Sequence, residues 1–207
     1  MLIITITTTT QQHTNLLEFN MDHYHYKVPG WFTFPKLYTE MVEKYDNAHF
    51  VEVGAWQGSS TTYMAVEIIN SKKNIKFSVY DIWGRYSLAG LNTKNPELLP
   101  EDYVYGLFLN NIDPVKHVVR PTKMSSNQAS TLHENGSLDF VFIDANHEYD
   151  AVMTDLMCWY PKVKKGGTIA GHDYWEDEGV RKAVQQFFNV NDDSLYVGER
   201  CWRVNVK

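Results

Sequence analysis

One stretch, FVEVGAWQGSS at positions 50–60, constrains the fold of this chain more than any other. It has the pattern of an apolar strand that contains a carboxylate, Glu52, and then turns through Gly54 and Gly58 into a helix beginning near Ser60. Glycine lets the backbone pass close to a ligand or take a positive φ, and the start of a helix offers free N–H groups. The stretch therefore predicts a strand, turn and helix that hold a nucleotide-containing cofactor, although two glycines alone are weak evidence.

Composition narrows the kind of partner. The chain has 207 residues, of which 43% are hydrophobic, so it can bury one sizeable domain. Its net charge of -6 argues against binding to nucleic acid or to an anionic membrane, because both need a basic face. The two cysteines, Cys158 and Cys201, match no metal or redox spacing, which favours a reduced, cytoplasmic setting. A small molecule is the expected partner.

Residues 1–30 are predicted to form an N-terminal arm, and residues 31–207 a single domain. The arm is threonine-rich and has no Lys or Arg before Lys27, which does not fit a secretory signal. No stretch of the chain is long and apolar enough to span a bilayer. The first 25 or so residues fit disorder, an added edge strand or a partner-binding arm, and the sequence does not separate these three.

Strand-like and helix-like runs alternate through the rest of the chain, which predicts an α/β fold with a Rossmann-like, doubly wound, seven-stranded sheet. Only Glu199 and Arg200 separate the last two runs, too few for a parallel crossover, so these runs are expected to pair as an antiparallel hairpin. A lid insertion is expected at about 84–105, where the periodicity breaks down. The expected strands are 49–53, 75–80, 117–120, 138–144, 166–171, 194–198 and 201–206; the expected helices are 35–44, 60–70, 101–111, 149–160 and 179–188, with a helical turn in 125–132.

Polar residues follow four of the buried strands at their carboxyl ends. They are Glu52 with Gly54, then Asp81, then Asp144, then His172 with Asp173. In open parallel sheets this edge is where ligands bind. Asp81 takes the place of an acidic residue that accepts hydrogen bonds from ribose hydroxyls, whereas Glu52 fits either a cofactor contact or an anchor beneath the turn. The spacing of Gly54 and Gly58 departs from G-x-G-x-x-G, which counts against a dehydrogenase.

Three motifs, the first of which is the turn described above, together make a family resemblance specific. They are Glu52-Val-Gly54 with Gly58-Ser-Ser, Asp144-Ala-Asn-His147-Glu-Tyr149, and Gly166-Gly-Thr-Ile-Ala-Gly-His172-Asp173-Tyr174. With Asp81 they resemble the class I S-adenosylmethionine-dependent methyltransferases. Within that class they are most similar to the metal-dependent O-methyltransferase branch, which includes macrolide-sugar O-methyltransferases and catechol O-methyltransferase-like enzymes. The resemblance covers about residues 49–206.

The resemblance implies a cofactor, S-adenosylmethionine, and a divalent metal, with Mg²⁺ or Mn²⁺ expected. It places the metal on Asp144, His172 and Asp173. Histidine stands here where the branch usually has an oxygen ligand, and this suits Mn²⁺, Fe²⁺ or Zn²⁺ better than an all-oxygen site would. Ser125 and Ser126 fall at the adenine, although a plain loop is an equal alternative. The implied cofactor-binding residues are Glu52, Gly54, Gly58, Ser59, Asp81, Ser125, Ser126 and Asp144.

Methyl transfer to an alcohol requires removal of the hydroxyl proton. A cation that binds the hydroxyl lowers its pKa, and a nearby base accepts the proton. His147, three residues after Asp144, is placed for that base, with capping of the next helix as its structural alternative. Tyr149 and Tyr174 suit packing of the pocket wall equally well. The predicted catalytic residues are therefore His147 and Asp144.

These observations predict an O-methyltransferase that acts on a hydroxyl of a small molecule, a sugar or a glycosylated compound. Three alternatives stay open: a metal-independent methyltransferase, a nicotinamide-dependent oxidoreductase, and a catalytically inactive cofactor-binding module. The glycine spacing and the terminal hairpin disfavour the oxidoreductase. A homo-oligomer is allowed, and the sequence does not name the methyl acceptor.

Overall fold

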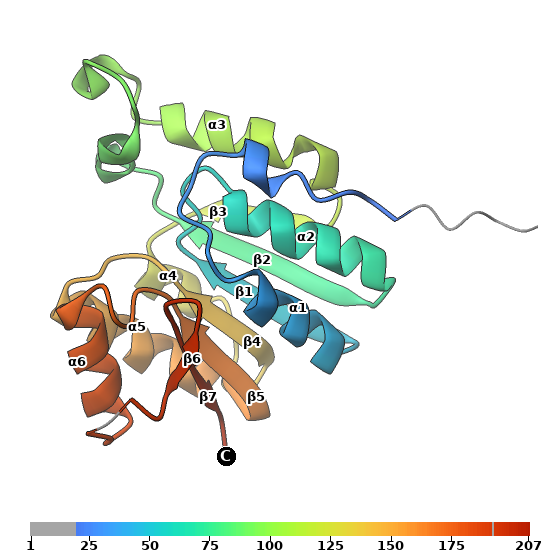
Figure 1. The fold of residues 1–207 in the computed structure, drawn as a ribbon, viewed down its shortest axis with the longest axis vertical. Helices are drawn as coiled ribbons and strands as arrows, with labels where there is room; N and C mark the ends of the chain where they lie inside the picture. Colours follow the sequence, from blue (N-terminus) through green and yellow to red (C-terminus); the bar gives the residue numbers. More distant parts are fainter. Residues whose placement is uncertain (1–19, 192) are drawn as a thin grey trace, which may run out of the picture.

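A seven-stranded sheet forms the centre of the molecule (Figure 1). The computed structural model describes residues 20–191 and 193–207. The strand order is β3-β2-β1-β4-β5-β7-β6, in which β1 to β5 run parallel and β7 pairs antiparallel with both β5 and β6. This confirms the predicted mostly parallel sheet with an antiparallel hairpin. The strands are β1 (Ala48–Val53), β2 (Ile75–Asp81), β3 (Val119–Lys123), β4 (Leu138–Ile143), β5 (Val163–Gly171), β6 (Tyr196–Gly198) and β7 (Cys201–Asn205).

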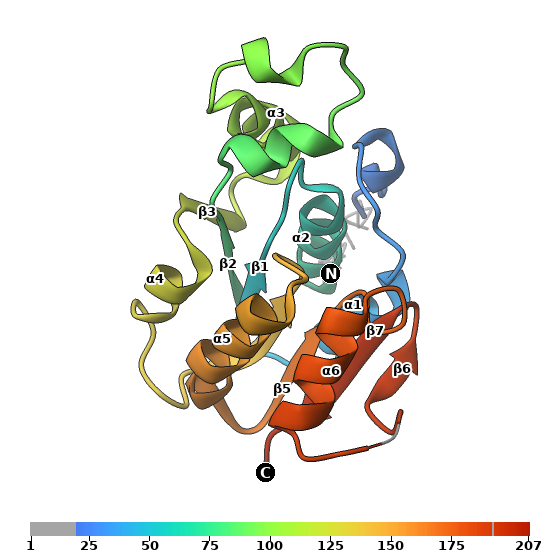
Figure 2. The same ribbon diagram turned by 90° about the vertical axis from the view of Figure 1, so that its left-hand side faces the viewer.

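Helices cover both faces of the sheet and enclose two apolar cores (Figures 1 and 2). One core lies between the sheet and α1, α2 and α3, where Phe50 and Phe142 point from the strands. The other lies under α4, α5 and α6, where Val51 and Ile143 point the opposite way, as alternation along a strand requires. The α-helices are α1 (Pro35–Lys44), α2 (Ser59–Ser71), α3 (Tyr103–Ile112), α4 (Ser126–Ser130), α5 (Tyr149–Trp159) and α6 (Glu178–Phe187).

Two strands begin later than the sequence predicts. The third strand was expected over 117–120 but runs Val119–Lys123, because Pro114 lies in a 3-10 turn, η4 (Asp113–Val115), that holds the chain off the sheet. The Val118 N–H bonds back to the Val115 carbonyl at 3.0 Å, so pairing with β2 starts only after it. The hairpin strand expected from 194 begins at Tyr196, whose N–H bonds to the Asp193 carbonyl at 2.9 Å in a turn.

The part of the predicted arm that the structure describes packs along α2. The Met21 N–H bonds to the Asn70 side chain at 2.7 Å, and His23 Nε2 lies 2.8 Å from a Glu67 carboxylate oxygen. A short 3-10 helix, η1 (His25–Lys27), follows. Residues 20–30 therefore belong to the folded domain by their contacts, and β3 and β6, not this segment, form the sheet edges. For residues 1–19, disorder, an added edge strand and a partner-binding arm all stay predictions, because these residues lie outside the described part of the chain.

The insertion after β2 consists of two 3-10 helices, η2 (Arg85–Gly90) and η3 (Pro96–Leu98), and leads into α3. A last 3-10 helix, η5 (Tyr160–Lys162), connects α5 to β5. Within 20–191 and 193–207, no helix has the length and apolar character needed to cross a membrane.

Candidate active site

The turn after β1 lies against the end of β4. Gly54 has a φ of 88°, and a Cβ at this position would lie 1.9 Å from the Asp144 carbonyl oxygen. The Asp144 N–H also bonds to the Val53 carbonyl at 2.8 Å. Only glycine accepts this backbone conformation and this approach without strain. The sequence at 54 thus brings the first motif and the Asp144 motif together where the strand order reverses, the place where such sheets bind ligands.

Asp81 holds the turn from the end of β2. Its Oδ2 accepts hydrogen bonds from the N–H groups of Ala55 and Trp56 at 2.8 and 2.9 Å, and its Oδ1 accepts one from Trp83 at 2.7 Å. The carboxylate is therefore fixed by three backbone donors while it still lines the cavity described below. The ribose contact expected of Asp81 stays a prediction, and the structure adds a second role in shaping the turn.

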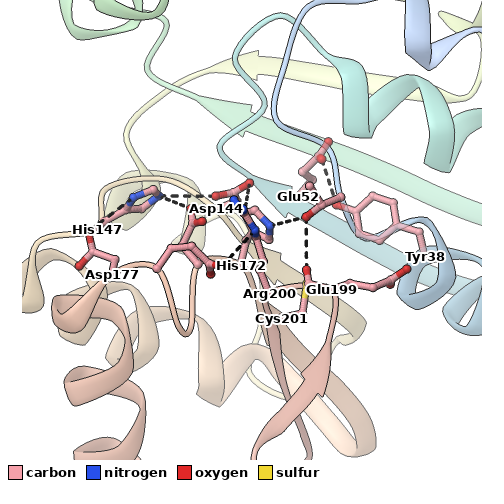
Figure 3. Close-up of polar contacts among 12 residues, drawn as sticks. Tyr38, Glu52, Asp144, His147, His172, Asp177, Glu199, Arg200 and Cys201 are labelled. Atoms are coloured by element: carbon pink, nitrogen blue, oxygen red, sulfur yellow. Dashed lines mark hydrogen bonds and ion pairs between the residues drawn. The ribbon is translucent and has the colours of Figure 1, made fainter.

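Glu52 lies behind the turn in a buried polar network (Figure 3). It accepts hydrogen bonds from the Tyr38 hydroxyl at 3.0 Å and the Thr61 hydroxyl at 2.5 Å. Burial raises the pKa of this carboxyl to about 7. Among the described residues that line the cavity, neither Glu52 nor Gly58 is present. Of the two interpretations of Glu52, the geometry matches the anchor beneath the turn.

A cavity of about 1020 Å³ opens at the carboxyl edge of the parallel strands. That volume is at the upper end of the range for sites that hold one drug-sized ligand, so a cofactor and an acceptor can fit at the same time. The cavity collects most residues that the sequence singled out: Gly54, Ser59, Asp81, Ser125, Ser126, Asp144, His147, His172 and Asp173.

The two serines differ in their surroundings. The Ser125 hydroxyl donates to side chains of its own turn at Asn127 or Gln128, 2.7 and 2.8 Å away. The Ser126 hydroxyl donates to Asp155 Oδ1 at 2.5 Å and accepts from the Trp159 indole at 2.9 Å. Asp155, whose pKa burial raises to about 6, also lines the cavity and was not expected from the sequence.

His147 lies between the carboxylates of Asp144 and Asp173, and a third carboxylate, that of Asp177, lies farther away. Its Nε2 is 3.6 Å from Asp144 Oδ1 and 3.2 Å from Asp173 Oδ2, and its Nδ1 is 4.0 Å from Asp177 Oδ2 (Figure 3). The nearby Asp144 carboxylate raises the pKa of His147 above its ordinary value. About two fifths of the side chain is exposed, at 39%, so the imidazole can exchange protons with solvent.

His172 approaches the same two carboxylates from inside the protein. Its Nδ1 lies 3.3 Å from Asp173 Oδ2 and 3.8 Å from Asp144 Oδ2, and its Nε2 is hydrogen-bonded to the Thr33 hydroxyl at 2.9 Å. Only 2% of the side chain is exposed. Burial lowers the pKa of His172, but the hydrogen bond to Asp173 and the charge of Asp144 outweigh burial and raise it.

Among the described residues, the group of three side chains that could hold a metal ion differs from the predicted one. Asp144, His147 and Asp173 place one ligand atom each within 4.8 Å of one another, whereas the predicted set had His172 in place of His147. Both imidazoles nevertheless face the same carboxylate pair. Two carboxylates with an imidazole form a donor set that suits Mn²⁺ and also accepts Mg²⁺, so the residues present fit a divalent cation.

Part of the cavity wall was missed by the sequence interpretation. It is the segment 29–34, called the strap below, which brings Trp31, Phe32 and Phe34 to the cavity. The strap is fixed by Thr33, whose hydroxyl contacts His172 and the Glu199 carbonyl, the latter at 3.3 Å. The only signal for it in the sequence was three aromatic residues within four positions directly after Gly30.

The fold and the site together define a class of protein. A sheet in the order 3-2-1-4-5-7-6, with an antiparallel seventh strand and a glycine turn at the switch point, is the class I methyltransferase architecture. The family model described as "Methyltransferase domain" matches residues 51–174, more than half of the chain. The chain belongs to this family and is an S-adenosylmethionine-dependent methyltransferase.

Solved structures share the fold at low identity. The O-methyltransferase NovP is 19% identical, with 83% of this chain and 78% of NovP covered and a TM-score of 0.59. A putative O-methyltransferase from Klebsiella pneumoniae is 16% identical, with coverages of 85% and 80% and a TM-score of 0.57. The O-methyltransferase from Bacillus cereus in complex with SAH is 13% identical, with coverages of 79% and 72% and a TM-score of 0.53. No curated protein matches the chain.

Proposed function

We propose that this methyltransferase transfers a methyl group from S-adenosylmethionine to a hydroxyl of a small molecule, a sugar or a glycosylated compound, with the help of a divalent metal. One observation carries the proposal. The cluster of Asp144, Asp173 and two histidines lies directly beside the Gly54 turn, since the Asp144 carbonyl is in contact with Gly54. Groups that can activate a hydroxyl therefore adjoin the expected site of the methyl donor.

The cofactor would lie along the polar wall of the cavity. Gly54 and Ser59 would face its methionine part, Asp81 its ribose, and Ser125 with Ser126 its adenine. Glu52 and Gly58 would act from behind, because Glu52 is buried and Gly58, with a φ of 90°, forms the bend at the start of α2. Gly58 also packs tightly, since a Cβ there would lie 3.0 Å from the Phe108 ring. The roles of Gly54, Ser59, Asp81 and the two serines are supported by their position around one cavity.

Asp144, His172 and Asp173 would hold the metal. When bound, a divalent cation polarises the acceptor hydroxyl and lowers its pKa. An imidazole that binds a metal is usually held at its other nitrogen, and Thr33 holds His172 in this way at Nε2. The nearness of His147 to both carboxylates also follows from attraction between an imidazolium and two acids. Because Thr33 holds the second nitrogen of His172, and because charge attraction alone accounts for the position of His147, we favour His172 as the third ligand.

His147 would accept the proton of the acceptor hydroxyl. A base must pass its proton on to solvent, and His147 is 39% exposed whereas His172 is 2% exposed. The carboxylates of Asp144 and Asp173 would keep the protonated imidazole stable. Asp177, 4.0 Å from Nδ1, would orient the ring.

A binding and turnover experiment tests the proposal. Calorimetry would measure affinity for S-adenosylhomocysteine, with NAD as the comparison, and methyl transfer from labelled S-adenosylmethionine would be followed on a panel of sugars and glycosides. We expect S-adenosylhomocysteine to bind and NAD not to bind. Turnover should be lost in EDTA and restored by Mn²⁺ or Mg²⁺. Turnover that persists in EDTA would favour the metal-independent methyltransferase. Binding without turnover on every acceptor would favour the inactive module.

A further inference from the structure

Two stacked tryptophans form part of the cavity wall. The rings of Trp31 and Trp56 lie 4.7 Å apart between centroids, with 29° between their planes. Both residues line the cavity, and yet Trp31, on the strap, is 66% exposed. Burial in the core therefore does not explain this ring. A large apolar side chain left in solvent at the wall of a ligand cavity marks a contact surface for a ligand.

Trp56 is held rigidly in an unfavourable backbone conformation. Its φ is 45°, a value that a bulky residue adopts only when its surroundings impose it. The surroundings are three hydrogen bonds: from its N–H to Asp81 at 2.9 Å, from its indole to the Ser87 carbonyl at 2.8 Å, and from the Trp83 indole to its carbonyl at 2.7 Å. Strain of this kind is concentrated at functional sites. The ring is thus a fixed base on which Trp31 lies.

The lid is shaped to fit the ring pair. A Cβ on Gly90, at the end of η2, would lie 2.8 Å from Trp56 Cζ2 and 3.0 Å from Trp31 Cη2. A larger residue at position 90 would therefore have to displace either the lid or the rings. The lid backbone therefore lies directly against the edge of the pair, which fixes both rings without covering the exposed part of Trp31.

The charges around the cavity limit what can bind there. Five acidic side chains line it: Asp81, Asp144, Glu148, Asp155 and Asp173. Among the described lining residues, Arg200 is the single lysine or arginine, and its Nε is paired with Glu176 at 3.0 Å. Away from a metal held by Asp144, His172 and Asp173, an anionic acceptor would meet repulsion from these carboxylates, and no unpaired lysine or arginine among the described lining residues would offset it.

Resting on the methyl-transfer function proposed above, we infer that the Trp31 and Trp56 pair is the acceptor subsite for an uncharged, flat, apolar ring. The acceptor class is then a neutral molecule that carries such a ring beside the hydroxyl to be methylated, as an aryl glycoside does. The exposed face of Trp31 stacks on the ring, and the acidic walls exclude carboxylated analogues.

Three glycosides test the inference as probes. Phenyl β-glucoside carries the flat ring, methyl β-glucoside lacks it, and phenyl β-glucuronide adds a carboxylate. Their dissociation constants would be measured by NMR titration on protein saturated with S-adenosylhomocysteine. We expect phenyl glucoside to bind about tenfold tighter than either of the others, the gain typical of one aromatic contact. Trp31→Ala should remove this advantage, and Trp31→Phe should keep most of it.

Trp175→Ala is the matched control, because Trp175 is an exposed tryptophan, at 44%, that does not line the cavity. It should leave all three constants unchanged. If wild-type protein fails to bind S-adenosylhomocysteine, the proposed function fails. If it binds S-adenosylhomocysteine but does not prefer phenyl glucoside, the inferred subsite is overturned. The same holds if Trp31→Ala keeps that preference. The inferred subsite is also overturned if Trp31→Ala weakens the binding of S-adenosylhomocysteine and leaves the dissociation constants of the glucosides unchanged.

Discussion

The two walls of the cavity are built in different ways. The wall where we propose that the cofactor binds, called the cofactor wall below, comes from strand ends and is fixed by backbone groups, such as the three N–H groups that bond to Asp81. The opposite wall comes from the strap and is fixed by side chains far away in the sequence, since Thr33 contacts His172 and Glu199 binds the start of α1. The comparison teaches that the fold itself provides the cofactor wall, whereas the strap wall depends on a few long-range contacts. Substitutions on the two walls should therefore differ in effect.

The largest effect is expected at the cofactor wall from Gly54→Ala. The new Cβ would lie 1.9 Å from the Asp144 carbonyl oxygen, so β1 and β4 would have to separate. We expect a loss of about 4 kcal/mol or more in the free energy of unfolding, and loss of S-adenosylhomocysteine binding. Chemical denaturation would measure the free energy of unfolding, and calorimetry would measure the binding of S-adenosylhomocysteine.

Gly136→Ala is the control for this change. Gly136 has a φ of 63°, but a Cβ there would meet no atom within 4 Å. It isolates the cost of the backbone conformation, which is about 1 kcal/mol. Equal destabilisation by the two substitutions would show that the approach of Asp144 to Gly54 is unimportant.

The second effect concerns the buried acid behind the cofactor wall. The pKa of Glu52 is raised to about 7 by burial, above its ordinary value of 4.5. A folded pKa above the unfolded one means that the folded protein binds the proton more tightly, so the contribution of Glu52 to stability is fully present below pH 4.5 and is lost as the pH rises through 7. The linkage corresponds to a loss of roughly 3 kcal/mol across that window.

Glu52→Gln should remove this pH dependence, because the amide does not titrate and still accepts from Tyr38 or Thr61. Unfolding would be measured between pH 4.5 and 8 for both proteins, and Glu43→Gln, at an exposed position of α1, serves as control. Parallel stability curves for wild type and Glu52→Gln would contradict the prediction.

The third effect distinguishes the roles of His172 and His147, which both lie where the two walls meet. His172→Gln removes the imidazole that Thr33 holds, so we expect Mn²⁺ affinity, measured by calorimetry, to fall about tenfold to a hundredfold. His147→Gln should leave Mn²⁺ affinity within about threefold and lower the turnover rate by about a hundredfold or more, as loss of a general base does. The reverse pattern would assign the metal to the group formed by Asp144, His147 and Asp173.

What the sequence could predict follows the same division. Gly54, Asp81 and Asp144 could be placed at one edge because parallel strands end together, whatever the remaining chain does. The strap could not be placed, because Thr33 meets His172 across 139 residues through a side-chain contact that no local pattern encodes. Glu52 was left with two roles, since alternation along a strand gives the face of a residue but not its hydrogen-bond partners. The nearness of His147 to Asp173 likewise depends on the bend at Asp173, which has a φ of 55°.

The smallest effect is expected at the strap wall from Glu199→Gln. Helix α1 begins after Phe34, which has no side-chain acceptor for the first N–H groups, and Glu199 supplies one from the hairpin turn. Its carboxylate oxygens lie 3.3 Å from the Lys36 N and 3.2 Å from the Leu37 N. A negative charge at a helix start that also accepts hydrogen bonds contributes about 1 kcal/mol, and the amide keeps part of this.

We therefore expect Glu199→Gln to lower the unfolding free energy by less than about 1 kcal/mol and to speed amide exchange at Lys36 and Leu37. Exchange at Gly54 and Ala55 on the cofactor wall should not change, because their N–H groups bond to the Tyr80 carbonyl and to Asp81. Glu43→Gln, at the exposed end of the same helix, should leave both sets unchanged. Faster exchange at Gly54 in Glu199→Gln would show that the two walls are coupled, because a loosened strap would then reach the cofactor turn through Thr33, His172 and Asp144.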